Sequence, residues 1–234
     1  MRFDVDTNLY SGAANLKMFL ENPANQSSHK VYVLNNTSLL IRNSEGETPG
    51  TPDTAVLDSQ YFFKDYSHRF DANDVFRYNF LKKGEKYNID KTNLTYDRLF
   101  DLNVFKIVKI DYTKGGDSLS LDASIDATPM KRLSNRVEGE YTFNSGRNGF
   151  NIGNTYTNRN VFGGAEQLDF RIRYGLLFNS DVQGTLVDKI FNRDLQFGIN
   201  LTFPRLITPF NTSRLTRNGV PHTTLSTSLQ IFDQ

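Results

Sequence analysis

The sequence has no cysteine among its 234 residues. This absence excludes disulfides, thiolate catalysis and cysteine-ligated zinc, and it leaves the redox compartment undetermined. Long hydrophobic runs are also missing, because no stretch approaches the ~18 consecutive apolar residues that a membrane-spanning helix needs. The sequence therefore excludes a helical membrane protein.

Neither sign of charge is in excess, since 27 basic residues face 26 acidic ones. There is no global positive field to attract nucleic acid, which is not expected as a partner. His29, His68 and His222 are far apart without metal-ligand spacing, so we expect exposed loop histidines and no metal or other cofactor. No Walker loop, nucleophile elbow or tuned carboxylate pair is present, and an enzyme is not expected.

The first residues lack the basic and apolar regions of a signal peptide, which indicates a cytoplasmic protein or an internal piece of an exported chain. Between Leu9 and Leu20 the alternation of Leu16 and Met18 with polar neighbours predicts a strand. A lone strand cannot be a domain. Residues 1–27 are therefore predicted to end a preceding unit.

Residues 28–130 mix strand and helix patterns. Residues 30–42 predict one or two strands broken at Asn35–Asn36, followed by an exposed loop over 43–54. A short helix within 70–84 has Asp71 or Asp74 as its N-cap and Gly84 as its terminator. A second helix is capped by Asp90 and carries one apolar face. That face is expected to consist of Tyr96, Leu99, Phe100 and Leu102. Strands over 104–112 and 119–127 follow, with a turn at 114–117.

After Pro129 every segment alternates with period two. The alternating apolar residues lie within five stretches: 137–143, 150–156, 168–176, 195–203 and 225–231. Strands of about ten residues are longer than the usual ~5 to 6 and match a tilted strand that crosses a bilayer. A soluble sandwich gives the same alternation, but the polar face with Asp169, Arg171 and Arg173 suits a water-filled lumen. The pattern favours a barrel.

Two motifs carry a resemblance to a known family. Residues 84–112, with a G-x-x-Y entry at Gly84–Tyr87, resemble the core of a POTRA domain. Residues 156–168 are similar to the N-R-N-L-F-G-G-A-E turn between the second and third barrel strands of the BamA/TamA superfamily, especially its TamA-like branch. Residues 124–129 resemble the strand that leaves the last POTRA domain. The resemblance covers about residues 28–180.

The resemblance implies the following fold class: an α+β POTRA domain (β-α-α-β-β) followed by antiparallel strands of an incomplete transmembrane β-barrel. The implied units are the end of a preceding POTRA-like unit (1–27), a POTRA domain (28–130) and about five barrel strands (131–234). A closed barrel of this kind has an even number of strands, at least about eight. The V-R-G-F loop and the terminal strand of the family are missing, so the chain is expected to be truncated and unable to seal a pore.

The resemblance also implies a function, which is assembly or translocation of outer-membrane proteins without nucleotide or metal. Unfolded clients or a periplasmic partner would add a strand to exposed edges, with residues 1–130 in the periplasm and the later strands in the bilayer. The first barrel strand would be the gate. Its residues are Arg136, Val137, Glu138, Gly139, Glu140, Tyr141, Thr142 and Phe143.

The turn motif has a physical interpretation of its own. Gly163–Gly164 permits the positive φ that reverses a hairpin, and Asn158–Asn160 is expected to be a solvated turn rather than a client contact. The motif residues are Asn158, Arg159, Asn160, Phe162, Gly163, Gly164 and Glu166. Two alternatives to the assembly function stay open: a soluble β-rich binding module, and a passive outer-membrane channel with a periplasmic adaptor domain.

Overall fold

The computed structural model describes residues 2–6, 15–19, 30–117, 119–144, 147–179, 182–185, 189–207 and 221–233, with backbone alone for 2–6, 15–19 and 144. Within these residues twelve strands form three sheets, and there are two helices. β1 (Arg2–Asp6) and β2 (Asn15–Phe19) form a separate antiparallel pair. The predicted strand between Leu9 and Leu20 therefore corresponds to β2, and β1 was not predicted.

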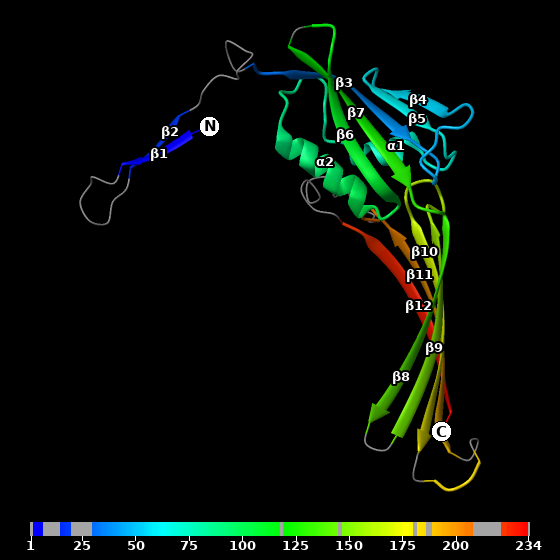
Figure 1. Cartoon of the computed structure of the whole chain (residues 1–234). Coiled ribbons are helices and arrows are strands. Elements are labelled where there is room, and N and C mark those ends of the chain that lie inside the picture. The colour runs from blue at the N-terminus through cyan, green and yellow to red at the C-terminus, as the bar shows by residue number, and fades with distance from the viewer. Residues whose placement is uncertain are drawn as a thin grey trace.

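The second sheet has the strand order β4-β5-β3-β7-β6. Its strands are β3 (Val33–Ile41), β4 (Asp53–Leu57), β5 (Tyr61–Asp65), β6 (Phe105–Lys114) and β7 (Ser120–Pro129). The central strand β3 runs parallel to β5 and β7, whereas the β4–β5 and β6–β7 pairs are antiparallel. The helices α1 (Ala72–Phe76) and α2 (Ile89–Asp101) follow β5 in the chain (Figure 1).

The predicted fold class is wrong. Residues 30–129 run β-β-β-α-α-β-β in a mixed sheet, and the two helices hold only 5 and 13 residues in a predominantly β chain. The sequence pattern missed the β4–β5 hairpin because Ala55–Leu57 shows no alternation and the reversal at Asp58 and Ser59 uses positive φ without glycine. The resemblance to a β-α-α-β-β domain therefore does not describe this sheet.

The core of this sheet is one cluster to which both helices contribute. Leu39 and Ile41 from β3, Ile125 from β7 and Leu99 from α2 are each at most 2% exposed. On β7, Ala123, Ile125 and Ala127 are buried in this core, whereas Leu119, which precedes the strand, is exposed. The predicted break at Asn35–Asn36 is an irregularity in the register of β3 with β7, where the Asp122 carboxylate accepts hydrogen bonds from both asparagines.

The N-cap of α1 is one that the sequence predicted, whereas the N-cap of α2 is not. Asp71 is the N-cap of α1, accepting hydrogen bonds from the Asn73 and Asp74 amides, as one of the two predicted alternatives. Asn88, not Asp90, caps α2. Gly84 does not end α1, which stops at Phe76; its φ of +80° serves a turn that bonds back to Leu34.

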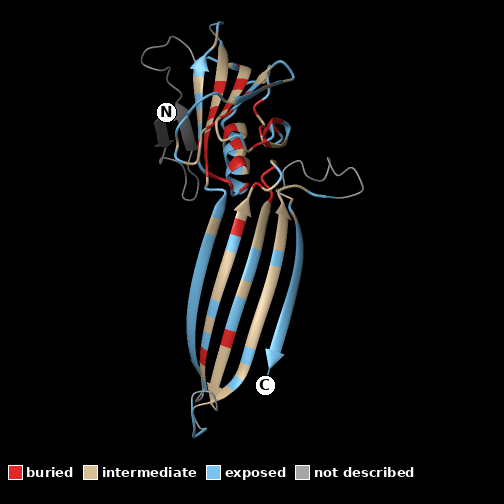
Figure 2. Cartoon of the chain, turned by 90° about the vertical axis from the view of Figure 1, so that its right-hand side faces the viewer, coloured by how far each residue is buried: buried red, intermediate tan, exposed pale blue. Residues whose placement is uncertain are grey.

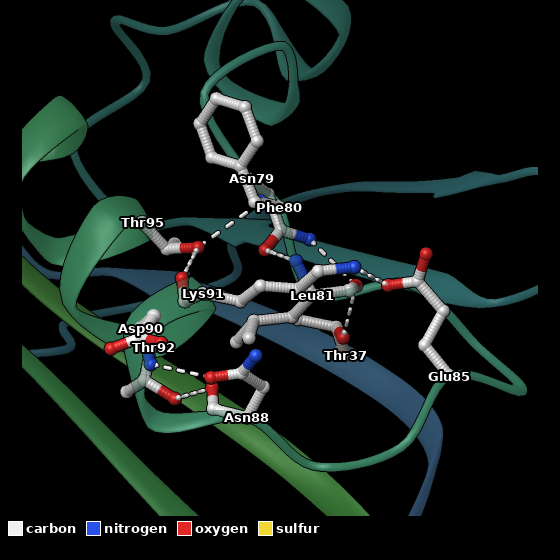
Figure 3. Close-up of polar contacts among 10 residues, drawn as sticks. All are labelled: Thr37, Asn79, Phe80, Leu81, Glu85, Asn88, Asp90, Lys91, Thr92 and Thr95. Atoms are coloured by element: carbon white, nitrogen blue, oxygen red, sulfur yellow. Dashed lines mark hydrogen bonds and ion pairs between the residues drawn. The ribbon is translucent and has the colours of Figure 1, made fainter. Parts of the chain in front are cut away.

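The inward face of α2 differs from the predicted one. Thr92, Thr95 and Leu99 are buried, whereas Tyr96 and Phe100 are exposed and stack on one another. The threonines tolerate burial because their hydroxyls are hydrogen-bonded. Thr95 Oγ1 accepts from the Phe80 amide at 3.1 Å and donates to the Lys91 carbonyl at 2.8 Å, as Figure 3 shows. α2 thereby fixes the segment that precedes it.

The third sheet is purely antiparallel and follows chain order, β12-β11-β10-β9-β8. Its strands are β8 (Leu133–Asn144), β9 (Arg147–Arg159), β10 (Gln167–Asn179), β11 (Ile190–Phe203) and β12 (Thr223–Asp233). They have 11 to 14 residues each, and the period-two pattern predicted each of them. In Figure 1 they extend away from the mixed sheet as one long curved layer.

Candidate functional site

The register of the long sheet sorts its side chains onto two chemically different faces, because residues directly opposite in an antiparallel pair share a face. One face is polar and includes Arg136, Glu138, Glu140, Asn151, Asp169, Arg171, Arg173, Gln196 and Gln230. The other is mainly apolar and includes Val137, Tyr141, Phe150, Ile152, Tyr156, Phe170, Ile172, Phe197, Ile199, Leu225, Leu229 and Ile231.

The apolar face is not covered by any element of the described residues. Every buried hydrophobic residue of the core lies before residue 130 except Ala165, which is in a turn. Val137, Tyr141 and Phe143 are 66–69% exposed, and Leu225 and Leu229 are 59% exposed. Figure 2 shows the same contrast, with most buried positions in the mixed sheet and its helices. The long sheet therefore has an exposed apolar surface and no core of its own among these residues.

The polar face carries paired charges around open hollows. Arg136 pairs with Glu138 at 2.5 Å, and Arg173 pairs with Glu140 at 2.9 Å. These four side chains help to line a hollow of about 460 Å³. Arg171 lies in this hollow and also in a neighbouring one of about 330 Å³ between β10, β11 and β12. Charged and solvated groups therefore lie on the side opposite the apolar surface.

The predicted gate residues all lie on β8, which is an edge strand with β9 as its only neighbour in the sheet. Arg136 to Phe143 are exposed without exception. Arg136, Glu138, Glu140 and Thr142 lie on the polar face, and the intervening residues lie on the apolar one. The opposite edge is β12. An edge strand presents one row of backbone N–H and C=O groups that its own sheet does not pair.

The predicted turn motif does connect β9 to β10, but it is not a solvated turn. Asn160 and Glu166 are 3% and 2% exposed. The Glu166 carboxylate accepts hydrogen bonds from the Phe162 and Gly164 amides, at 3.3 and 3.0 Å. Gly163 has a φ of +104°, which justifies glycine at this position. The solvated interpretation was wrong for Asn160 because it considered the turn without its neighbours.

These neighbours belong to the mixed sheet and its helices. The Asp71 amide, at the N-cap of α1, donates to the Gly163 carbonyl at 3.0 Å, and Asn160 Nδ2 donates to the Arg69 carbonyl. Asn160 Oδ1 accepts from the Ala165 amide at 2.8 Å. Asn158 and Arg159 are half-buried, and Phe162 is 68% exposed. The motif is thus the contact by which the long sheet docks on α1 and the loop before it.

Further docking contacts come from residues that the sequence did not single out. Tyr78 Oη donates to the Pro204 carbonyl at 2.5 Å, just after β11 ends. Arg205 pairs with Asp74 of α1 at 3.0 Å. Burial raises the pKa of Tyr78 above its usual value. No local sequence pattern marks Tyr78 or Arg205, because their partners are more than a hundred residues away.

The loop that receives the turn is organised by Asp65, which is fully buried. Its carboxylate accepts hydrogen bonds from the Ser67 amide and hydroxyl and from the Arg69 and Phe70 amides. This satisfies the buried charge and places the Arg69 carbonyl against Asn160. Asp65 is therefore a positioning residue for the junction.

The residues described contain no cluster of three histidine, aspartate or glutamate side chains suited to a metal ion. Neither α1 nor α2 has the length and apolar character required to cross a membrane. His68 is exposed and contacts Asp53 at 2.9 Å, His222 is exposed, and His29 lies outside the described residues.

Comparisons with known proteins give little for this chain. No protein-family model matches it, and no curated protein matches it. Among solved structures it is similar to BamA from Haemophilus ducreyi lacking POTRA domains 1–3, at 11% identity and a TM-score of 0.32. The match covers 81% of this chain and 49% of that one, so the chain spans about half the length of that structure. A likeness this weak fixes neither fold nor function, and it does not distinguish a TamA-like branch.

Proposed function

We propose that this chain is part of an outer-membrane protein assembly or translocation factor whose exposed strand edges capture unfolded clients. The observation that carries the proposal is the two-faced long sheet: its apolar face is uncovered, and its opposite face is charged and hollowed. A soluble sandwich would bury the apolar face against a second sheet. In a bilayer the same face contacts lipid while the polar face contacts water.

The dimensions of the strands support this placement. A transmembrane strand needs ~9–11 residues when tilted by about 45°. The five strands have 11 to 14, enough to cross and extend slightly beyond the hydrocarbon layer. The docked turn and the mixed sheet lie at one end of the strands (Figure 2). In the proposed orientation this end faces the periplasm.

Capture of clients would take place by strand addition. β8 and β12 are the edges of the long sheet, and β4 and β6 are the edges of the mixed sheet. Pairing through main-chain hydrogen bonds is tolerant of client sequence. In lipid each unpaired backbone group costs several kcal/mol, so the client's own pairing supplies the driving force without nucleotide. β8 is the proposed gate, as an edge strand with both faces exposed, and β12 is the corresponding edge on the other side of the sheet.

Bilayer placement is tested by cysteine labelling, for which the cysteine-free chain is already suited. Val137→Cys and Glu138→Cys place single thiols on opposite faces of the same strand. In vesicles a water-soluble maleimide should label Glu138→Cys and leave Val137→Cys largely unlabelled, with both fully labelled after denaturation. Equal labelling of the two folded variants contradicts the bilayer placement.

Client capture is tested by site-specific photo-crosslinking in the same vesicles. A photoreactive residue at Glu138 on edge strand β8 is compared with one at Gln196 on central strand β11, on the same polar face. A urea-denatured eight-stranded outer-membrane protein should crosslink at position 138 and not at 196. Faster insertion of that client with the chain present supports assembly, whereas ion conduction without either effect identifies a passive channel.

A further inference from the structure

Three cationic side chains, Arg69, Arg132 and Arg159, gather where the mixed sheet meets the long sheet, and Lys131 is next to Arg132 in the chain. Lys131 and Arg132 directly precede β8, Arg69 precedes α1, and Arg159 ends β9. Arg69 Nη1 donates to the Met130 carbonyl at 3.0 Å, and its Nη2 approaches the Arg159 carbonyl at 3.5 Å. These contacts place the Arg69 guanidinium between the start of β8 and the end of β9.

This positive charge is not neutralised within the described chain. None of the four cations has an ion-pair partner among the described residues. Asp65 is the anion that acts on Arg69, but its oxygens already accept four hydrogen bonds. The Nε atoms of Arg69 and Arg159 are buried without a hydrogen-bond partner in this part of the structure. Among the described residues the cluster therefore retains unpaired N–H donors and positive charge that no carboxylate neutralises.

Burial and repulsion from the neighbouring cations both affect the pKa of Arg69. Burial lowers this pKa first, and the neighbouring Arg132 and Arg159 lower it further, against the opposing effect of Asp65. A bound anion would relieve the repulsion among these cations. A guanidinium pair is suited to a phosphate group, which accepts several charge-assisted hydrogen bonds.

The Arg132 side chain, at the end of edge strand β8, reaches a residue of the apolar face. Its Nε donates to Asn158 Oδ1 at 3.3 Å, and Asn158 is paired with Leu133 on the apolar face. Leu133 and Tyr156 on that face are 50% and 40% exposed. At the same end of the sheet the exposed Phe162 stacks with Phe203, with ring centroids 6.4 Å apart. Transmembrane barrels carry girdles of aromatic residues at both membrane interfaces.

We propose that Lys131 and Arg132, supported by Arg69, bind the phosphate of an anionic phospholipid at the end of the long sheet next to the mixed sheet. Arg159 donates to Ser134 on the polar face, so it contributes potential rather than a contact. The lipid tails would lie along the apolar face beside Leu133. This inference rests on the proposed placement of the sheet in a bilayer, because that placement brings headgroups to the cluster.

The test measures lipid binding to the full chain in neutral maltoside micelles by calorimetry. The probes are dihexanoyl phosphatidylglycerol, dihexanoyl phosphatidylcholine and inorganic phosphate. Phosphatidylglycerol should bind more tightly than phosphatidylcholine, and Arg132→Gln should weaken it about fivefold, as expected for ~1 kcal/mol per surface cation. Arg132→Lys keeps the charge and should retain most of the affinity.

Lys114→Gln is the matched control, because it removes an exposed cation at the far end of the ten-residue strand β6, which begins at Phe105. Equal loss in Lys114→Gln and Arg132→Gln overturns the proposal, as does the absence of any preference for phosphatidylglycerol. Inorganic phosphate that binds as tightly as phosphatidylglycerol identifies a general anion site and overturns the lipid assignment. The micelle assay does not depend on client capture or on cysteine labelling, so failure here is distinct from failure of the proposed function.

Discussion

The amide of Asp71 donates a hydrogen bond to the carbonyl of Gly163, and this bond joins the cap of α1 to the β9–β10 turn. The same aspartate caps the helix with its side chain and docks the long sheet with its backbone. Asn160 supplies the second bond of the junction, to Arg69.

Replacing Asn160 by alanine should destabilise the junction by about 2 kcal/mol or more. The change leaves the Ala165 amide and the Arg69 carbonyl without their bond to this side chain, at about 1–3 kcal/mol for each buried group. Urea unfolding of the full chain in micelles checks this. Asn135→Ala, at an exposed position of β8, should shift the midpoint little. Equal shifts of the two midpoints would show that Asn160 contributes no more to stability than an exposed asparagine.

Gly163→Ala should cost about 1–2 kcal/mol, because its φ of +104° is strained for a residue with a Cβ. The added Cβ would itself fit, with its nearest neighbour, the Asp71 nitrogen, at 3.7 Å. Gly139→Ala, where a Cβ meets nothing within 4 Å, should be neutral or slightly stabilising. Thermal unfolding of the two variants in parallel separates backbone strain from loss of space, and an unchanged Gly163→Ala contradicts the turn geometry.

The junction should weaken at alkaline pH through Tyr78. Burial raises the folded-state pKa of this phenol above the unfolded value of about 10, so the folded state favours the neutral form that donates to Pro204. Its contribution is present below the unfolded pKa and is lost as pH rises through the folded one. Tyr78→Phe should remove this part of the stability loss above pH ~10. Unfolding midpoints of both proteins from neutral to alkaline pH measure it.

Thr95→Val should expose the Phe80 amide to exchange. Valine matches threonine in shape but cannot accept the 3.1 Å hydrogen bond, and an unpaired buried amide costs about 1–3 kcal/mol. Hydrogen exchange should accelerate at Phe80 more than at the strands of the core. Thr54→Val, on the exposed edge strand β4, serves as the control. Unaltered protection of Phe80 would mean that the Thr95 hydroxyl does not hold this segment.

The local alternation of apolar and polar residues was sufficient to predict the strands of the long sheet, but it was insufficient to predict those of the mixed sheet. Strands of 11 to 14 residues give enough repeats for period two to be recognised, whereas β4 has five residues and no alternation. The helix α2 was located correctly, and Leu99 and Leu102 of its predicted face are buried. The rest of the buried face was missed, because Thr92 and Thr95 are polar by type and buried through their hydrogen bonds.

The candidate site was predictable in the same partial way. The gate strand and the turn could be placed along the chain, and glycine at position 163 suggested its positive φ. The docking of the turn could not be predicted, since Arg69 and Asn160 are 91 residues apart in the chain and no local pattern links them. The sequence alone does not distinguish a buried turn asparagine such as Asn160 from a solvated one.

The junction also determines how force passes through the molecule. Its side-chain contacts reach the β9–β10 turn and the end of β11, so a push on α1 is delivered to the interior strands of the long sheet. β8 is joined to the mixed sheet mainly through its own chain at Met130–Arg132. Rotation of the mixed sheet would therefore act directly on β9, β10 and β11, and it would reach β8 through the pairing of that strand with β9.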